Sequence, residues 1–145
     1  MIPDEQSNGN LPSGIHVASW QEFTRRFGYN DHRKILLKGL KRALSNLRKA
    51  GCLDVYINGS FITNKELPED FDGCWNWDGV DEDKIDNVLL EFANERAAQK
   101  KKYGGELFPN FIEGASQISF LEYFQKDKST KEPKGIIQID LRTVL

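Results

Sequence analysis

The chain has little of what marks disulfide-rich, zinc-binding or membrane-spanning proteins. Its 145 residues include two cysteines and two histidines, which are too few for a disulfide framework or for a zinc site built from cysteine pairs. Cys52 and Cys74 are therefore predicted to be small buried residues. No apolar run approaches the roughly 20 residues needed to cross a bilayer, and the N-terminus lacks the basic flank and apolar stretch of a secretion signal. We expect a cytoplasmic protein with no membrane association.

Hydrophobic residues make up 39% of the chain and include nine Phe, four Tyr and three Trp. A chain of this length and composition can bury the core of one domain. Residues 1–14 are rich in Asn, Ser, Gly and Pro and contain few apolar side chains, which is typical of a mobile segment. The sequence thus predicts a flexible leader over 1–14 and a single domain over 15–145.

The formal net charge is only −2, but the two signs are separated along the chain. Residues 25–49 hold nine Lys or Arg and one acid, Asp31, whereas residues 66–95 hold eleven acids and one base, Lys84. A basic helix is either a solvated surface or a contact site for nucleic acid. RNA, tRNA included, is therefore one candidate partner, beside the reading as ordinary solubilising charge.

Two helices are predicted in the first third of the chain. Ser19, followed three residues later by Glu22, forms a capping box for a short helix that ends at Gly28. A second helix is expected to be capped by Asp31 and to end before Gly51. Its predicted buried stripe consists of apolar residues at helical spacing: Ile35, Leu36, Leu40, Ala43, Leu44 and Leu47.

The remainder of the chain alternates strand patterns with one long helical pattern. Strands are expected over 53–58, 70–75, 106–109, 118–125 and 135–141, and a helix over 81–102. This alternation favours an α/β (α+β) fold with a small mixed β-sheet backed by helices. In such a fold the strand ends and the turns after them commonly form the functional site.

One motif carries most of the functional information. Gly59 and Ser60 end the strand over 53–58, and nine residues later Asp70-Phe71-Asp72 begins the next strand. The glycine lets backbone approach a phosphate closely, and the serine hydroxyl can donate to a phosphate oxygen. Asp70 and Asp72 project from one face of an extended segment, so both carboxylates can bind one or two divalent cations. Two such cations would stabilise the attacking and leaving oxygens of an in-line displacement.

The same residues also fit an ordinary Gly-Ser turn followed by a solvated acidic loop. The context favours a site, because a predicted strand precedes the turn and a predicted helix follows the carboxylates. Lys65 lies between the two parts of the motif. Its side chain is placed either to meet a phosphate or to lie in solvent.

The order Ile57-Asn58-Gly59-Ser60, nine residues, Asp70-Phe71-Asp72 resembles the signature of the nucleotidyltransferase-fold superfamily, the fold of DNA polymerase beta and the minimal nucleotidyltransferases. Further segments resemble a small uncharacterised bacterial and phage family of nucleotidyltransferase-like proteins: 11–16, 19–23, 26–28, 103–109, 133–136 and 139–141. This likeness spans nearly the whole chain.

The resemblance implies roles for the residues of the motif. Ser60 would contact the phosphates of a nucleoside triphosphate, while Asp70 and Asp72 would bind Mg²⁺ (or Mn²⁺). Gly59 and Lys65, which the residue pattern places beside the phosphates, would complete the nucleotide-binding part.

A third carboxylate on a later strand is implied as well. Glu106 is the first candidate after the long predicted helix, and Asp140, in the strand over 135–141, is the alternative. Chain order leads us to assign Glu106 as the third member of the metal site.

The implied activity is metal-dependent transfer of a nucleoside monophosphate from a nucleoside triphosphate to a hydroxyl of RNA, protein or a small molecule. Members of the superfamily occur in toxin–antitoxin pairs, so a partner protein in such a pair or in phage defence is also implied. The alternative is a non-catalytic nucleotidyltransferase-fold scaffold or antitoxin-type partner protein, because Gly73 interrupts the carboxylate strand and the helical domain of larger relatives is missing.

Overall fold

A computed structural model describes residues 2–110, 125, 130 and 132–144. Its strands are β1 (Gly14–Ala18), β2 (Asp54–Asn58), β3 (Phe71–Asn76), β4 (Gly105–Asn110) and β5 (Gly135–Asp140). Its α-helices are α1 (Trp20–Phe27), α2 (Asp31–Lys49) and α3 (Ala93–Tyr103). Short 3₁₀ turns are η1 (Ser60–Ile62), η2 (Glu82–Lys84), η3 (Asn87–Leu90) and η4 (Leu141–Thr143).

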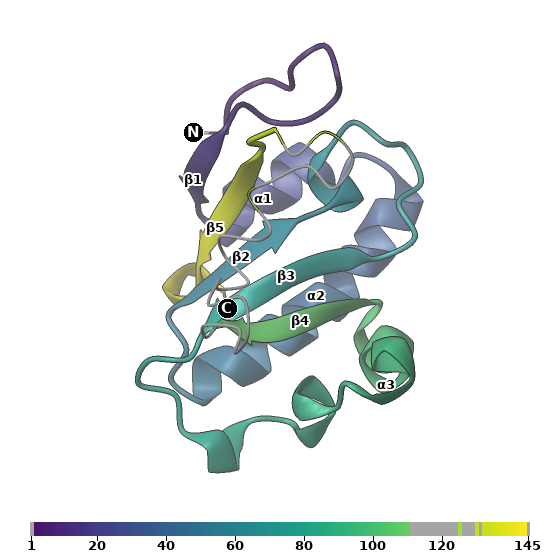
Figure 1. Cartoon of the computed structure of the whole chain (residues 1–145). Helices are drawn as coiled ribbons and strands as arrows, with labels where there is room; N and C mark the ends of the chain where they lie inside the picture. The colour runs from purple at the N-terminus through teal and green to yellow at the C-terminus, as the bar shows by residue number, and fades with distance from the viewer. Residues whose placement is uncertain (1, 111–124, 126–129, 131, 145) are drawn as a thin grey trace.

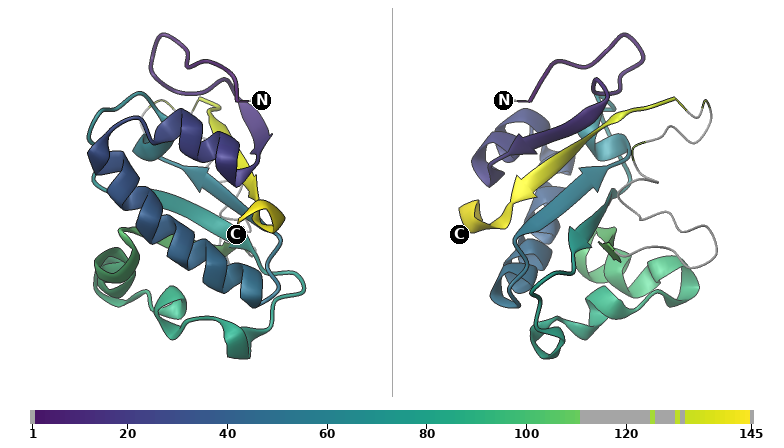
Figure 2. Two further views of the ribbon diagram at one scale, coloured as in Figure 1. Left: turned by 180° about the vertical axis from the view of Figure 1, so that it is seen from behind. Right: turned by 60° about the vertical axis from the view of Figure 1, so that its left-hand side comes forward.

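The strands form one mixed sheet in the order β1-β5-β2-β3-β4 (Figure 1). β2 is antiparallel to both of its neighbours, whereas β1 pairs in parallel with β5 and β3 in parallel with β4. Helices α1 and α2 cover one face of the sheet, and α3 lies beside the β4 edge (Figure 2). The predicted α/β class, with a small mixed sheet backed by helices, is confirmed.

Alternation along the strands separates the core from the polar face of the sheet. Val55 and Ile57 of β2 and Phe71 and Trp75 of β3 are fully buried in the core that α1 and α2 cover. The residues directly next to each of them in the strand point to the opposite face, because successive side chains of a strand alternate. That opposite face carries the candidate site.

The first two helices form as predicted, with a shift at the start of the second. Ser19 Oγ accepts from the Glu22 backbone N–H at 3.1 Å, which caps α1. The cap of α2 is Asn30, whose side chain accepts from Arg33 N–H at 2.8 Å, so Asp31 is the first helical residue and not the cap.

The buried stripe of α2 differs from the prediction at one position. Ile35 is 67% exposed, while Leu37, which the pattern left out, is buried together with Leu36 and Leu40. The helix therefore presents a face slightly rotated from the one expected.

The predicted helix over 81–102 is wrong in its first half. Asp81 Oδ1 accepts from Asp83 N–H at 3.0 Å, and Asp86 Oδ1 accepts from Val88 N–H at 3.1 Å. Such local side-chain bonds compete with a helical backbone and stabilise short turns. The chain consequently forms η2 and η3, and α3 begins only at Ala93.

The segment predicted to be a flexible leader contacts the rest of the chain, and its first residues lie against α1. Ile2 and Leu11 are 6% and 1% exposed. Arg26 Nη1 donates to the Ile2 carbonyl at 3.1 Å and Nη2 to the Pro3 carbonyl at 2.8 Å. The pattern of small and polar residues missed these contacts, and it also missed β1, which begins at Gly14.

The strands of the motif are confirmed, and Gly73 does not shorten the carboxylate strand. A Cβ atom at position 73 would lie 2.3 Å from the Tyr56 carbonyl oxygen, so the close approach of β2 explains the glycine. The predicted strand over 118–125 falls outside the described residues except for Gln125. Among the described helices, none has the length and apolar character of a bilayer span.

Candidate functional site

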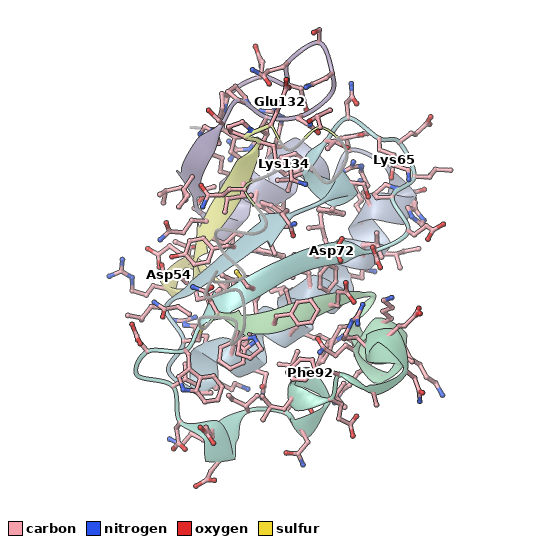
Figure 3. The ribbon with its side chains drawn as sticks, in the orientation of Figure 1. Asp54, Lys65, Asp72, Phe92, Glu132 and Lys134 are labelled. Carbon is pink, nitrogen blue, oxygen red and sulfur yellow. The ribbon has the colours of Figure 1, made fainter. Side chains whose placement is uncertain are left out.

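Three adjacent strands bring three polar side chains into one row. In the sheet register Asn58 of β2 is the partner of Asp72 of β3, and Asp72 is the partner of Glu106 of β4. Cross-strand partners project from the same face, so the three side chains are neighbours. We call Asn58, Asp72 and Glu106 the polar row; Asp72 is labelled in Figure 3.

Asp70 lies one residue before β3 and on the same side of the chain as Asp72. Burial raises the pKa of the Asp70 carboxyl, and the nearby charge of Glu106 raises it further. The ammonium groups of Lys100 and Lys65 act in the opposite direction on this pKa. The charges of Glu106 and Lys65 therefore both act on the Asp70 carboxyl, and the sequence assigned these two residues to the same site as Asp70.

The turn after β2 has a backbone conformation that requires glycine. Gly59 has φ 78° and ψ −165°, a region that side chains rarely adopt. A Cβ atom there would lie 2.7 Å from Asp72 Oδ2. Ser60 then opens η1, so the Gly-Ser turn is held directly against the polar row.

Gly59 and Ser60 also line a pocket of about 220 Å³. Its wall includes Thr63 from the loop after η1, and Lys134, the residue before β5. The pocket joins a backbone turn, two hydroxyl side chains and a cationic residue, which is the chemistry that binds phosphate groups. Figure 3 labels Lys134 near the end of β2 that leads to this turn.

A buried arginine fixes the loop that connects the turn to the carboxylates. Arg33 is fully buried, and its guanidinium donates to the carbonyl oxygens of Phe61, Thr63 and Lys65 at 2.7, 2.9 and 2.6 Å. Arg33 is one of the nine basic residues over 25–49, which we expected on the surface, and for Arg33 this expectation is wrong. Its charge is used inside the protein to hold the chain between Ser60 and Lys65.

Two cations from α3 contact the third carboxylate. Arg96 Nε lies 2.7 Å and Lys100 Nζ 3.8 Å from Glu106 Oε2. The hydrogen bond to Glu106 raises the pKa of Arg96. Arg96 reaches Glu106 from an unusual backbone, because Asn94, Glu95 and Arg96 all have positive φ, between 53° and 62°.

Asp140, the alternative third carboxylate, lies elsewhere on the sheet. Its partner across β2 is Asp54, whereas Asp72 pairs with Asn58, four residues further along that strand. Four residues of a strand span about 13 Å. Asp140 instead holds Arg142 by hydrogen bonds of 3.0 and 2.9 Å, which lower the pKa of its carboxyl.

The side chains of the site are of the chemical type that binds a divalent cation, but they are not grouped as a complete set of metal ligands. Carboxylates and amide oxygens are the ligands that Mg²⁺ and Mn²⁺ prefer. Asn58 Oδ1 is buried and has no hydrogen-bond partner within the described chain, and Asn58 is 5% exposed, so an oxygen of the right type is unused beside Asp72. Over the same described residues, however, no three His, Cys, Asp or Glu side chains are grouped closely enough to hold a metal ion.

Sequence reasoning missed several polar residues of this site. Asn58 stands inside the quoted motif, and its place directly after the buried Ile57, on the opposite face of the strand, was the signal. Arg96 reaches Glu106 from a stretch of positive φ at the start of α3 that no sequence pattern reveals, and Lys100 follows it in the same helix. Lys134 lies in a polar segment whose sequence carries no comparable signal.

The cysteines take no part in the site. Both thiols are buried, as predicted, and burial raises the pKa of Cys52 to about 11 and that of Cys74 to about 12. Thiols with such pKa values are protonated at neutral pH and unreactive.

The fold and the polar row define an α/β protein with an acidic site at one end of a mixed sheet. Residues 3–140 match a family of unknown function, DUF6932, and the chain belongs to that family. No curated protein sequence and no solved structure matches the chain significantly. The family carries no assigned activity, so any statement of function depends on the motif and on the geometry above.

Proposed function

We propose that the protein is a metal-dependent nucleotidyltransferase, which moves a nucleoside monophosphate from a nucleoside triphosphate to a hydroxyl group and releases pyrophosphate. The observation that carries this proposal is the register of β2, β3 and β4. It makes Asn58, Asp72 and Glu106 neighbours, with the Gly59-Ser60 turn directly against Asp72. The chain order of this set is the one that the nucleotidyltransferase-fold resemblance implies.

Each part of the site has a distinct task in this reaction. The Gly59-Ser60 turn and Lys134 would bind the triphosphate in the pocket they line, and Lys65, whose charge acts on Asp70, would contact it from the side of the carboxylates. Asp70, Asp72 and Glu106 would hold Mg²⁺ (or Mn²⁺), with Asn58 Oδ1 as a neutral oxygen ligand. The chemistry that the cation supplies is neutralisation of the charge that develops on the transferred phosphoryl group.

Arg96 has to leave Glu106 for this site to form. Its guanidinium occupies the oxygen that a cation would contact, at 2.7 Å. A released guanidinium is planar and can bind two phosphate oxygens at once. Arg96 would thus neutralise the charge of Glu106 in the empty site and the charge of the triphosphate once the nucleotide is bound.

The proposal is tested by label transfer. The protein is incubated with each α-³²P-labelled nucleoside triphosphate, Mg²⁺ or Mn²⁺ and cell extract, which supplies RNA, protein and small-molecule acceptors. Asp72→Asn is expected to reduce labelled product at least a hundredfold, as loss of a charge-stabilising group does. Asp140→Asn is the matched control, because it is the same substitution in the same sheet and keeps an oxygen that accepts from Arg142 N–H. Absence of label, or equal label in both variants, would refute the proposal.

A non-catalytic scaffold is the second candidate. The ion pairs of Glu106 with Arg96 and Lys100 favour it, because they already compensate the charge that a metal would otherwise balance. Such a protein would bind a nucleotide or a partner protein without turnover, for example as one member of a toxin–antitoxin or phage-defence pair.

Calorimetry separates the two candidates. An enzyme that uses these carboxylates binds nucleoside triphosphate more tightly with Mg²⁺ than without it, and Asp70→Asn weakens that dependence. Nucleotide binding of equal affinity with and without Mg²⁺, unchanged by Asp70→Asn, supports the scaffold.

A further inference from the structure

A second surface lies on the helical side of the protein, between α2 and the end of α3. Here a groove of about 890 Å³ is lined by seven basic side chains. They are Lys38, Lys41, Arg42 and Lys49 from α2, and Lys100, Lys101 and Lys102 from α3. Of the described residues that line it, none is Asp or Glu. We call this surface the basic groove; Figure 2 shows the two helices that form it.

The basic residues of α2 form a continuous face. Lys38, Lys41, Arg42 and Lys49 are spaced by three, one and seven residues, so they lie on one side of a helix over about three turns. All four are exposed. A second hollow of about 510 Å³ shares Ser45 and Lys49 with the groove and adds Arg48, which extends the basic surface further along α2.

The two walls are held at a fixed separation. A Cβ atom at Gly39 would lie 1.8 Å from the Tyr103 carbonyl oxygen, so only glycine lets α2 come this close to α3. Arg42 Nη2 donates to the Lys102 carbonyl at 2.6 Å. The position of α2 against α3, the two helices that line the groove, is therefore set by the fold.

Most of these charges are not compensated inside the protein. Lys102 pairs with Asp86 at 2.5 Å and Lys100 with Glu106 at 3.8 Å. Lys38, Lys41, Lys49 and Lys101 form no ion pair with the part of the chain that the structure describes. Like charges brought this close repel one another, and a ligand with repeated negative charge relieves that repulsion.

We propose that the basic groove binds a polynucleotide through its phosphates, and that this polynucleotide supplies the acceptor hydroxyl; the second part rests on the proposed transferase function. Charge complementarity along two contiguous hollows fits a polymer of phosphates better than a single nucleotide. Tyr103 is the aromatic residue among the described lining, and it is 5% exposed, so bases have no ring to stack on. Binding is therefore independent of base sequence.

Lys100 connects the groove to the polar row. Its side chain lines the groove, and its ammonium lies 3.8 Å from Glu106 Oε2. A strand in the groove thus runs past the residue that neutralises the third carboxylate.

The test measures binding without any transfer reaction. A fluorescein-labelled single-stranded RNA of about 20 nucleotides is titrated with the full chain in EDTA, at several salt concentrations, and fluorescence anisotropy is read. The parent is expected to bind, with a log K that falls linearly with log salt. Lys38→Glu with Lys41→Glu should weaken binding at least tenfold and reduce the salt slope by about 1.4, the value for two lost contacts with a single strand.

The matched control is Arg25→Glu with Arg142→Glu. It makes the same change in net charge at two exposed residues outside the groove lining, and it should leave the affinity within about twofold of the parent. Equal weakening by both double variants would show unspecific attraction and overturn the proposal. No binding of RNA, or binding of phosphatidylserine vesicles in place of RNA, would overturn it as well.

Failure of this proposal and failure of the transferase proposal give different results. Asp72→Asn should bind the RNA as tightly as the parent, because the assay contains neither metal nor nucleotide. RNA binding without label transfer leaves the groove assignment in place and removes the enzymatic one. Label transfer that is unchanged by the Lys38→Glu, Lys41→Glu variant removes the acceptor assignment alone.

Discussion

Gly59 and Asp72 are in such close contact that no side chain fits at position 59. A Cβ atom there would lie 2.7 Å from Asp72 Oδ2, and the backbone has φ 78°. The contact joins the end of β2 to the carboxylate on β3. The turn and Asp72 therefore form a single structural unit, and a substitution in the turn displaces the Asp72 carboxylate.

Gly59→Ala is accordingly expected to lower the free energy of unfolding by about 1–3 kcal/mol for the backbone strain, with a further loss from the clash. Chemical denaturation measures the change. Gly79→Ala is the control, because Gly79 also has a positive φ, 76°, but a Cβ there meets nothing within 4 Å. Equal losses in the two variants would mean that the contact with Asp72 has no energetic weight.

Asn58→Leu tests whether the buried amide is kept for a ligand. Asn58 Oδ1 is buried without a partner in the described chain, so an apolar side chain of similar size should leave the free energy of unfolding unchanged or raise it by about 1 kcal/mol. The rise in Tm on adding Mg²⁺ and a non-hydrolysable nucleoside triphosphate should disappear.

Asn76→Leu is the comparison on the same face of the sheet. Asn76 Oδ1 accepts from Asp78 N–H at 3.0 Å, so this variant should lose stability and keep the response to the ligand. A large loss of stability in Asn58→Leu would show that Asn58 is a structural residue.

Arg96→Gln is expected to strengthen Mg²⁺ binding several-fold in the absence of nucleotide. The guanidinium competes for Glu106 Oε2, and its removal leaves a carboxylate that attracts a cation. The measurement is the Tm of each variant as a function of Mg²⁺ concentration. Arg25→Gln removes an exposed charge from α1 and should behave as the parent. A smaller Mg²⁺ response in Arg96→Gln than in the parent would contradict the competition.

The pH dependence of stability should report on Asp70. Its pKa is raised in the folded protein by burial and by Glu106, so the folded state binds the proton more tightly than the unfolded state. Stability from this group is present below the unfolded pKa of about 3.9 and is lost as the pH rises through the folded pKa.

Asp70→Asn removes the loss of stability that accompanies ionisation of Asp70. The Tm of this variant should exceed that of the parent at pH 7 and equal it near pH 3. Thermal denaturation across this range provides the comparison. Asp78→Asn, at an exposed carboxylate outside the site, should show no such pH-dependent gain. If Asp70→Asn has the lower Tm at pH 7, Asp70 stabilises the fold through its charge.

The sequence predicted the parts of the fold that depend on local periodicity and capping. Ser19 with Glu22, and Gly51 after α2, mark helix ends through backbone bonds within a few residues, and both predictions hold. The strands on either side of the motif follow from alternation. The helix over 81–102 failed because Asp81 and Asp86 bond their own neighbouring backbone, which an apolar pattern of helical spacing does not reveal.

The candidate site was predictable where it lies within one motif. Gly59 and Asp72 could be paired because a turn and the next strand are adjacent in most sheets. Arg96 could not be found, since its reach to Glu106 requires three residues with positive φ at the start of α3. The burial of Arg33 could not be predicted either, because its partners are backbone carbonyls, which every residue has and which no sequence pattern identifies.

Helix α3 touches both surfaces of the protein. Its first turns bring Arg96 and Lys100 to Glu106, and its last turn brings Lys101 and Lys102 to the basic groove, where the Gly39 contact holds it. Binding of a ligand to one surface therefore changes the affinity of the other surface for its ligand. If a phosphate strand draws Lys100 away from Glu106, it increases the affinity for Mg²⁺. Thermodynamic reciprocity then requires Mg²⁺ to increase the affinity for the strand by the same factor.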